Sequence, residues 1–428
     1  MPSMRFAPIF SVFVVACLLN LTVFAEDELM AGTHCIDTKT PEAFSESVTT
    51  FWSGDGNGFV GSWNSGYAVH WQKTETAGKD APIQYSAYLS GMKIFGVPAE
   101  QIKLEVVAGK LCEIEIMFFN KGDTASRLGF GSESVKSRGE KKDFTEKQWE
   151  KCADEIRRIL GKFGKARRGK IGSLKLRRSV EIWENGANAF LLDAQENEFV
   201  RVLVVPSVQL KKLMSSAAER AKGDLRENVV RRPNGDVLVG EIPMVDQGQK
   251  GYCVPATIER VLRYYGISEL DMHKIAELAE TNVGGGTTMP DVVRGVGPVV
   301  KKNRLKFATR RMQFAKIRQC VDKGIPMFWC MFAAPDYLNR LRANTLERAA
   351  VSDFSAFAKK LKNADKLEIP RNELMRHAHV CLIIGYNSKT KEVCVSDSWG
   401  DHTAEQWIAF EDALYVTQKN ASLYILEK

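Results

Sequence analysis

The chain has 428 residues, which is enough for two or three domains with buried cores, so the fold does not depend on disulfide staples. Its 60 basic and 52 acidic residues give a net charge of +8. After the N-terminal segment no run reaches the ~20 apolar residues that a membrane span needs, and no nucleotide-binding motif occurs, which excludes an ATP-driven transporter.

The first 25 residues have the pattern of a secretory signal peptide. Arg5 supplies a positive charge, a mostly apolar run follows over residues 6–24, and Val23-Phe24-Ala25 is a small-residue cleavage site. We therefore expect an exported mature chain that is periplasmic, secreted or bound at the cell surface. A lipoprotein cleavage box at Val14-Val15-Ala16-Cys17 is the alternative, although the apolar residues after Cys17 argue against it.

Residues 26–232 are predicted to form an α+β region of unknown fold and role. We expect a charged loop over residues 131–142, and each half of the region runs from a helix into strands, which suggests a duplicated unit. The predicted strands are Phe59–Trp71, Ile102–Phe118, Val180–Trp183, Ala189–Leu192 and Val200–Val205, and the predicted helices are Trp149–Phe163 and Val208–Arg226.

A basic stretch lies within this region, over residues 162–178. It contains eight Lys or Arg residues and no acidic residue. Such a stretch can dock onto anionic surface polymers or lipid headgroups, or it can be a solvated loop and strand edge. Because Phe163 is its only aromatic residue, and because the chain is expected to be exported, we do not expect nucleic acid as a partner.

The nine cysteines and six histidines do not form a metal-binding pattern. No CxxC or HExxH motif occurs, so we expect neither a zinc site nor another cofactor. If Cys253 is a free thiolate, an odd number of cysteines remains after Cys17. Pairing of Cys35 with Cys112, or of Cys112 with Cys152, is compatible with export, and the sequence does not choose between them.

A turn at Arg231–Gly235 is predicted to separate this region from a second domain over residues 236–428. This domain is expected to alternate helices with apolar strands, and a charged helical insertion at 339–376 would flank or gate a cleft. The predicted helices follow Cys253 and lie at Asp271–Ala279, Met289–Val296 and Phe314–Lys323, and the predicted strands are Pro326–Phe332, His379–Tyr386, Val393–Ser396, Trp407–Phe410 and Leu423–Leu426.

Cys253 is the candidate nucleophile. Pro255 fits the first turn of a helix, and the apolar residues Ile258, Val261 and Leu262 follow at helical spacing, so Cys253 is expected at a helix N-terminus. A free thiol ionises near pH ~8.5, and the positive end of a helix together with an imidazolium can lower that value by several units.

Three further residues complete a candidate catalytic set. His379 opens an apolar strand and would act as the base, and Asp397 would hold its imidazole in the required tautomer. Gln247 stands six residues before Cys253, and its amide would bind the oxyanion together with the Cys253 backbone N–H. His377 is the alternative base and Gln249 is the alternative oxyanion donor.

Four motifs in this order resemble those of the papain-like cysteine peptidases. They are Gln247-Gly248, Cys253-Val254-Pro255-Ala256, the strand from His379 to Gly385-Tyr386, and Asp397-Ser398-Trp399-Gly400. Asp in the third catalytic position and the Cys-x-Pro-Ala run resemble the bacterial peptidases that cut double-glycine leader peptides, although Val254 departs from the glycine of that branch. The resemblance implies a fold in which the nucleophile helix packs on an antiparallel sheet over residues 236–428.

The function that follows from these motifs is an exported cysteine peptidase acting on a peptide or protein substrate through an acyl-enzyme. A transglutaminase-like acyltransferase shares the Cys-His-Asp order and is the first alternative. A catalytically inactive protein that binds peptides on the same fold is the second. The upstream region is expected to recruit substrate, dock on a surface or inhibit the enzyme as a prodomain.

Overall fold

The computed structural model describes residues 36–52, 58–63, 69–75, 83–129, 138–171, 178–214, 225–248, 251–267, 269–281, 286–418 and 423–428. The predicted signal peptide, Cys17 and Cys35 lie outside these residues. No helix in the described part of the chain combines the length and the apolar character that crossing a membrane requires.

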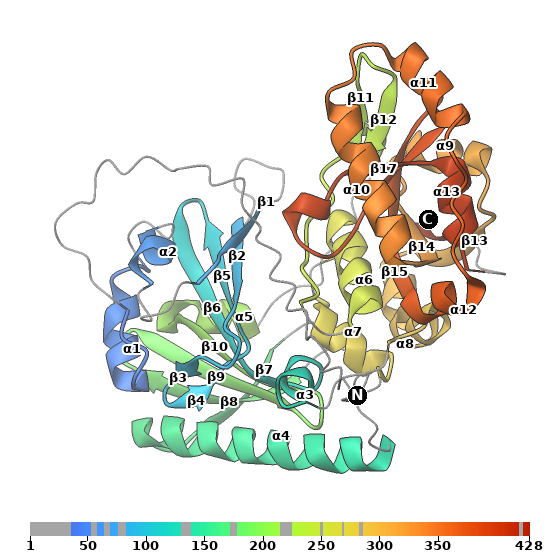
Figure 1. Cartoon of the computed structure of the whole chain (residues 1–428). Helices are drawn as coiled ribbons and strands as arrows, with labels where there is room; N and C mark the ends of the chain where they lie inside the picture. The colour runs from blue at the N-terminus through green and yellow to red at the C-terminus, as the bar shows by residue number, and fades with distance from the viewer. Residues whose placement is uncertain are drawn as a thin grey trace, which may run out of the picture. The chain divides into compact units, whose positions relative to one another are not determined.

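The N-terminal region is built on an antiparallel sheet of eight strands (Figure 1). Its strands are β1 (Gln72–Glu75), β2 (Ile83–Tyr88), β5 (Gln101–Val107), β6 (Lys110–Asn120), β7 (Arg167–Ile171), β8 (Arg178–Asn185), β9 (Asn188–Gln195) and β10 (Phe199–Pro206). A separate hairpin joins β3 (Lys93–Ile94) to β4 (Val97–Pro98).

The order of the strands in this sheet is mirrored about its centre. It runs β1-β2-β5-β6-β10-β9-β8-β7, so β6, the last strand of the first half, pairs with β10, the last strand of the second half. Helix α1 (Pro41–Thr49) precedes the first four strands and helix α4 (Arg138–Leu160) precedes the second four. The topology agrees with the duplicated helix-and-strand unit that the sequence suggests.

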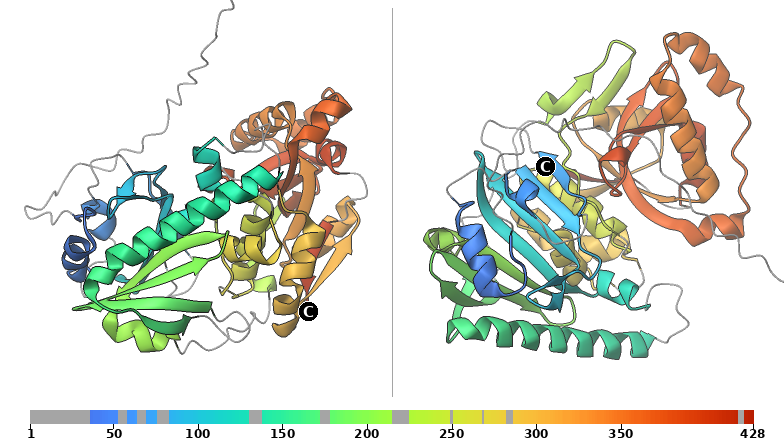
Figure 2. Two further views of the ribbon diagram at one scale, coloured as in Figure 1. Left: turned by 90° about the horizontal axis from the view of Figure 1, so that it is seen from below. Right: turned by 60° about the vertical axis from the view of Figure 1, so that its left-hand side comes forward.

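One apolar face of this sheet is covered by the two helices, and α4 runs along it (Figure 2). Phe44 and Val48 of α1 and Ile156 and Leu160 of α4 are buried in the same core as Ile102 and its alternate neighbours on β5. The alternation of side chains leaves Gln101, Lys103 and Glu105 on the other face of the sheet. That face is polar where β2, β5 and β6 form it.

Several predicted elements of this region differ from the structure. Gly58–Ser62 is the short helix α2, so the predicted strand at Phe59–Trp71 is wrong there, and strand pairing begins only at Gln72. The predicted loop at 131–142 is replaced from Arg138 onward by α4, because the charged residues before Trp149 extend the helix rather than interrupt it. Of the predicted helix Val208–Arg226, the structure describes α5 (Leu210–Met214), and residues 215–224 lie outside it.

Among the described residues, the N-terminal region also contains the short helix α3 and several 3-10 turns. They are α3 (Asp123–Arg127), η1 (Gly161–Phe163), η3 (Ser207–Gln209) and η4 (Arg226–Asn228). Cys152 on α4 is a free thiol, so a bond between Cys112 and Cys152 is not formed.

The C-terminal region contains a second sheet, which is antiparallel throughout its described pairs. Its order is β11-β12-β15-β14-β18-β13, and β16 and β17 extend from β15. The strands are β11 (Val229–Arg231), β12 (Asp236–Val239), β13 (Lys306–Arg310), β14 (Met327–Phe332), β15 (Ala378–Asn387), β16 (Glu392–Ser396), β17 (Gln406–Ala409) and β18 (Leu423–Glu427).

Helices pack around this sheet, and α6 carries the candidate nucleophile. They are α6 (Cys253–Tyr264), α7 (Met272–Leu278), α8 (Met289–Lys302), α9 (Phe314–Val321), α10 (Pro335–Ala349), α11 (Phe354–Lys362), α12 (Arg371–Leu374) and α13 (Phe410–Val416), with 3-10 turns η5 (Met375–His377) and η6 (Asp401–Thr403). Ile258, Val261 and Leu262 on one side of α6 are buried in the core of the sheet, as their spacing predicts. Gly266, with a φ of 82°, follows the helix end.

The predicted turn at Arg231–Gly235 lies inside the second sheet. It joins β11 to β12, which pair with each other, and β12 pairs with β15. The second sheet therefore starts at Val229, before the turn. A Gly turn between two short strands has the same local pattern as a linker, which explains why the sequence does not distinguish the two.

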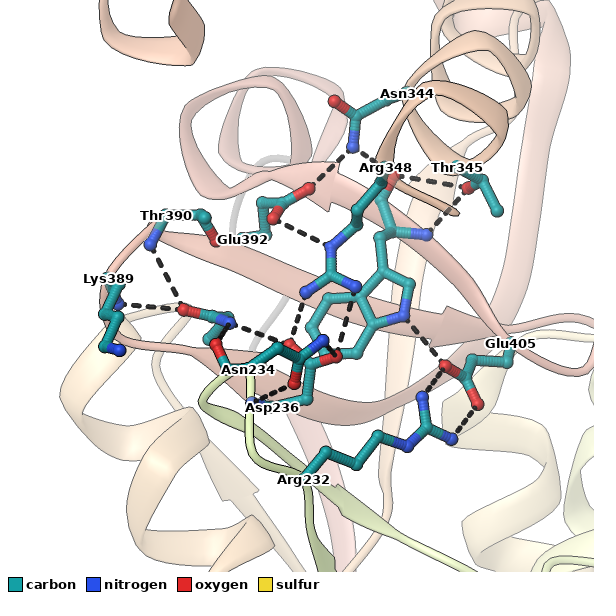
Figure 3. Close-up of polar contacts among 12 residues, drawn as sticks. Arg232, Asn234, Asp236, Asn344, Thr345, Arg348, Lys389, Thr390, Glu392 and Glu405 are labelled. Atoms are coloured by element: carbon teal, nitrogen blue, oxygen red, sulfur yellow. Dashed lines mark hydrogen bonds and ion pairs between the residues drawn. The ribbon is translucent and has the colours of Figure 1, made fainter. Parts of the chain in front are cut away.

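The charged segment before His379 is helical, as predicted, and a buried ionic network fixes it to the sheet (Figure 3). The Arg348 guanidinium on α10 binds the Asp236 carboxylate on β12 and donates to Glu392 on β16 at 3.0 Å. Asn344, one turn earlier, donates to Glu392 at 2.7 Å and to the Trp407 carbonyl at 2.8 Å. The Arg348 side chain lies 3.9 Å from the centre of the Trp407 ring.

Because Asp236 and Glu392 are fully buried, replacing Arg348 should be costly. Arg348→Met is expected to lower the free energy of unfolding by about 3–5 kcal/mol, since it leaves two buried carboxylates without their cation. Chemical denaturation would measure it. The matched control is Lys360→Met, which breaks an exposed pair with Glu347 of α10 and should cost less than about 1 kcal/mol. Equal effects of the two changes would contradict the role given to Arg348.

Candidate functional site

Cys253 is the first residue of α6, so its thiol lies at the positive end of the helix. The preceding residue, Tyr252, makes no side-chain hydrogen bond to the helix end. Pro255 occupies the first turn, where its missing N–H costs nothing. Cys253 is 9% exposed, and the His379 side chain and the Val380 backbone lie close enough to lower the pKa of its thiol. The predicted nucleophile therefore sits beside the predicted base.

His379 and Asp397 are joined by a short, buried hydrogen bond. His379 is near the start of β15, and Asp397 directly follows β16, which pairs antiparallel with β15. His379 Nε2 lies 2.8 Å from Asp397 Oδ1 and 2.9 Å from Oδ2. Because Asp397 occupies Nε2, the hydrogen bond with Cys253 falls to Nδ1.

The charges in this cluster favour a thiolate and an imidazolium. Burial raises the pKa of Cys253, but the hydrogen bond and the charge of His379, with the Val380 backbone, outweigh it and leave the pKa below its usual value. Burial lowers the pKa of His379, but the charge and hydrogen bond of Asp397, with Cys253, outweigh it and raise the pKa to about 10. At pH values between these two pKa values, the thiol has lost its proton and the imidazole has kept its own, so the two groups form an ion pair.

The loop after Asp397 reinforces this geometry. The Ser398 N–H donates to Asp397 Oδ1 at 2.7 Å, which fixes the carboxylate. The Trp399 ring stacks on the His379 imidazole, with centres 4.5 Å apart and an angle of 24° between the planes. Trp399 therefore covers one face of the imidazole and keeps water from the His–Asp bond on that side.

Gln247 lies beside the loop that follows Asp397. It is buried, and its backbone N–H donates to the Ser398 carbonyl at 2.8 Å. The structure thus places Gln247, the predicted oxyanion donor, against Ser398, which directly follows Asp397 in the chain. The alternative donor Gln249 lies outside the described residues. The alternative base His377 sits in η5, and the partner of Asp397 is His379.

Sequence reasoning missed two residues on α6, Thr257 and Arg260, which lie four and seven positions after Cys253 and therefore on its side of the helix. The Thr257 hydroxyl lies 3.3 Å from both the Val380 carbonyl and the Ser398 hydroxyl. A polar residue at both of these spacings, on the side of the helix that carries Cys253, is the signal that would have identified them.

Arg260 is 1% exposed, and its guanidinium joins three segments of the chain. It donates to the Pro243 carbonyl at 2.9 Å, to the Asp397 carbonyl at 2.6 Å and to the Ser396 hydroxyl at 2.6 Å. Burial lowers the pKa of Arg260 to about 10, so the group remains charged at neutral pH. One side chain therefore ties the nucleophile helix to the Asp397 loop and to the segment that leads to Gln247.

Among the described residues, no cluster of His, Cys, Asp and Glu is arranged to hold a metal ion. The chemistry that the site can perform is nucleophilic attack by a thiolate, with an adjacent acid and base on one imidazole. Its three groups come from a helix and two neighbouring strands.

The comparison with protein families finds a match over residues 239–422 to the Peptidase_C39 like family. This match confirms that the C-terminal region resembles the C39 branch of the papain-like peptidases. A comparison with curated proteins finds no match. One matching solved structure is described as a candidate C39-like peptidase from Bacillus anthracis, with 16% identity, 45% coverage of this chain, 98% coverage of that chain and a TM-score of 0.28. At that score the likeness supports no conclusion.

Arg260→Met should destabilise the protein by about 3 kcal/mol or more, because each buried acceptor left without a donor costs roughly 1–3 kcal/mol. Arg260→Lys should be less stable than the unmodified chain but more stable than Arg260→Met, because an ammonium keeps the charge but lacks the planar set of donors of a guanidinium. Urea denaturation would measure both variants. Arg294→Met is the control, since its pair with Asp291 is exposed and should contribute little to stability. Unchanged denaturation of Arg260→Met would exclude the role assigned to this side chain.

Proposed function

We propose that the chain is a cysteine peptidase, starting from the match of residues 239–422 to the Peptidase_C39 like family. The observation that supports this most directly is the grouping of Cys253, at the N-terminus of α6, with the hydrogen-bonded pair His379–Asp397, whose imidazole lowers the pKa of the thiol. A bound peptide would be attacked at its carbonyl carbon by the Cys253 thiolate. As the C–S bond forms, the carbonyl electrons move to oxygen, where the Cys253 N–H and the Gln247 amide would donate hydrogen bonds.

His379 then carries the proton in both halves of the reaction. Its imidazolium gives a proton to the leaving nitrogen, the C–N bond breaks and an acyl-enzyme remains. A water molecule next attacks the thioester carbonyl while His379 takes its proton, and the acid product leaves as the thiolate re-forms. Asp397 holds the ring so that Nδ1 faces the sulfur throughout.

Two alternatives share this scaffold. A transglutaminase-like acyltransferase would use the same acyl-enzyme but pass it to an amine rather than to water. An inactive peptide-binding protein would need no activated thiol, and the lowering of the Cys253 pKa by His379 counts against it. Product analysis of a peptide library with and without a primary amine, by mass spectrometry, separates hydrolysis from acyl transfer.

We also propose that the protein is exported, on the basis of residues 1–25 of the sequence. In that setting the basic stretch at 162–178 would contact anionic polymers or headgroups of a cell surface.

The thiolate can be tested by alkylation of Cys253 with iodoacetamide at a series of pH values. Labelling should already be fast at pH values below ~8.5, where an ordinary thiol is still protonated, because the lowered pKa of Cys253 keeps its thiolate populated there. In His379→Ala the charge and hydrogen bonding of the imidazole are lost while burial remains, so labelling should rise only near or above pH ~8.5. Hydrolysis should decline again near pH 10, where His379 loses its proton.

Two cysteines with raised pKa values provide internal controls for this measurement. Burial raises the pKa of the Cys152 and Cys330 thiols to about 12, so their labelling should be slow at every pH used. Labelling of Cys253 in the unmodified chain that rises only near pH ~8.5, as for an ordinary thiol, would contradict the proposed function.

Gln247→Ala should separate oxyanion binding from thiolate formation. Peptide hydrolysis should fall roughly 10²–10³-fold, while the pH profile of alkylation stays unchanged, because alkylation forms no oxyanion. Rates of peptide cleavage and of labelling are compared in the same preparation. The control is Gln319→Ala on the exposed side of α9, which should change neither rate. If Gln247→Ala slowed both reactions equally, Gln247 would have a structural role instead.

A further inference from the structure

The N-terminal sheet presents a polar face to the C-terminal region, within the compact unit that residues 35–428 form. On β2, Tyr85 and Ala87 are buried in the N-terminal core, so Gln84, Ser86 and Tyr88 point to the opposite face. A pocket of about 20 Å³, large enough for one water molecule, lies between this face and the C-terminal region. Its lining includes Gln84, Lys103, Asp246, Glu259 and Arg263.

Polar contacts fix the two regions together across this face. The Arg263 guanidinium on α6 donates to the Gln84 amide oxygen at 2.7 Å. Arg201 on β10, which also binds Asp193 on β9, donates to Asp271 at 2.5 Å, and Asp271 caps the N-terminus of α7. Arg201 is 3% exposed, so this ion pair is well shielded from solvent.

Tyr88 makes the contact that matters for catalysis. Its hydroxyl donates to the Asp246 carbonyl at 2.8 Å. Its ring also lies against Gly248, where a Cβ atom would come within 2.7 Å of two ring carbons. Gly248 has a φ of 69°, so both its conformation and the closeness of Tyr88 require glycine there.

The three residues 246–248 form one turn, with Gln247 at its centre. The Asp246 carboxylate accepts the Gly248 N–H at 2.8 Å, and the Gln247 N–H donates to the Ser398 carbonyl. Tyr88 thus holds the residues on both sides of Gln247, while the Asp397 loop holds Gln247 itself. Burial, with the nearby charges of Asp123, Asp246 and Glu259, raises the pKa of Tyr88 well above its usual value, so the hydroxyl keeps its proton.

We propose that Tyr88 is a positioning residue for the oxyanion donor Gln247, and that the N-terminal region thereby completes the active site. This inference rests on the proposed peptidase function and gives the upstream region a supporting role, as opposed to that of an inhibitory prodomain. Tyr88 acts through the turn at 246–248 and touches no reacting atom.

The test compares acylation with alkylation in the full chain. Acylation by p-nitrophenyl acetate passes through a tetrahedral oxyanion, and alkylation by iodoacetamide does not. Tyr88→Phe keeps the ring and removes the hydroxyl, so acylation, followed as the burst of p-nitrophenolate, should slow roughly tenfold, less than the 10²–10³-fold expected for loss of the donor itself. The pH profile of Cys253 alkylation should not move.

A double-mutant cycle with Gln247→Ala shows whether Tyr88 acts through Gln247. If it does, adding Tyr88→Phe to Gln247→Ala should cause no further loss. Tyr415→Phe is the matched control, because its hydroxyl bonds to the backbone of Ile369 and it should leave both rates unchanged. Two results would overturn the proposal. One is an acylation rate of Tyr88→Phe that equals or exceeds the rate of the unmodified chain, and the other is additive losses of the acylation rate in the cycle.

Amide hydrogen exchange decides the same question without catalysis. Tyr88→Phe should speed exchange of the Gln247 and Gly248 amides, and thermal unfolding should show that the protein remains folded. Unchanged exchange at these two amides would overturn the proposal. If Cys253 of the unmodified chain labels as an ordinary thiol, the peptidase function fails, and the exchange result still shows whether Tyr88 holds the turn.

Discussion

The hydrogen bond between His379 and Asp397 is the interaction on which the geometry of the C-terminal region depends. A carboxylate and an imidazole are stable in a buried position only when each compensates the other, so the strands that carry them must be neighbours. The antiparallel pairing of β15 and β16 meets this requirement, since one strand begins where the other ends. Helix α6 is then attached to the same place through Thr257 and Arg260, which brings Cys253 to the imidazole.

Much of this arrangement is legible in the sequence because it depends on local patterns. The apolar spacing after Cys253 predicts the helix, and the apolar run after His379 predicts the strand that carries it. Arg260 was missed because a charged residue on a helix normally lies in solvent, and only the tertiary structure supplies the three acceptors that allow it to be buried. Tyr88 was missed for a related reason, since its partner Asp246 is 158 positions away.

The mirrored N-terminal sheet contributes to the C-terminal region from both of its halves. Gln84 and Tyr88 on β2 come from the first half, and Arg201 on β10 comes from the second. Their partners include the turn before the nucleophile and the cap of α7. This sheet has an apolar face under its own helices and a polar face toward the C-terminal region. The polar face can hold that region in a defined orientation, because directional hydrogen bonds fix orientation better than apolar contacts do.

The mirrored strand order also determines how this sheet ends. Pairing the two halves through β6 and β10 places β1 and β7 at the outer edges of the described sheet, where each pairs with one neighbouring strand. Such edges can recruit a strand from another molecule and begin aggregation. Both edge strands are short, and β7 carries Arg167, Arg168 and Lys170 within five residues. Like charges on two approaching β7 edges repel each other, so the basic stretch would keep copies of this protein from joining edge to edge.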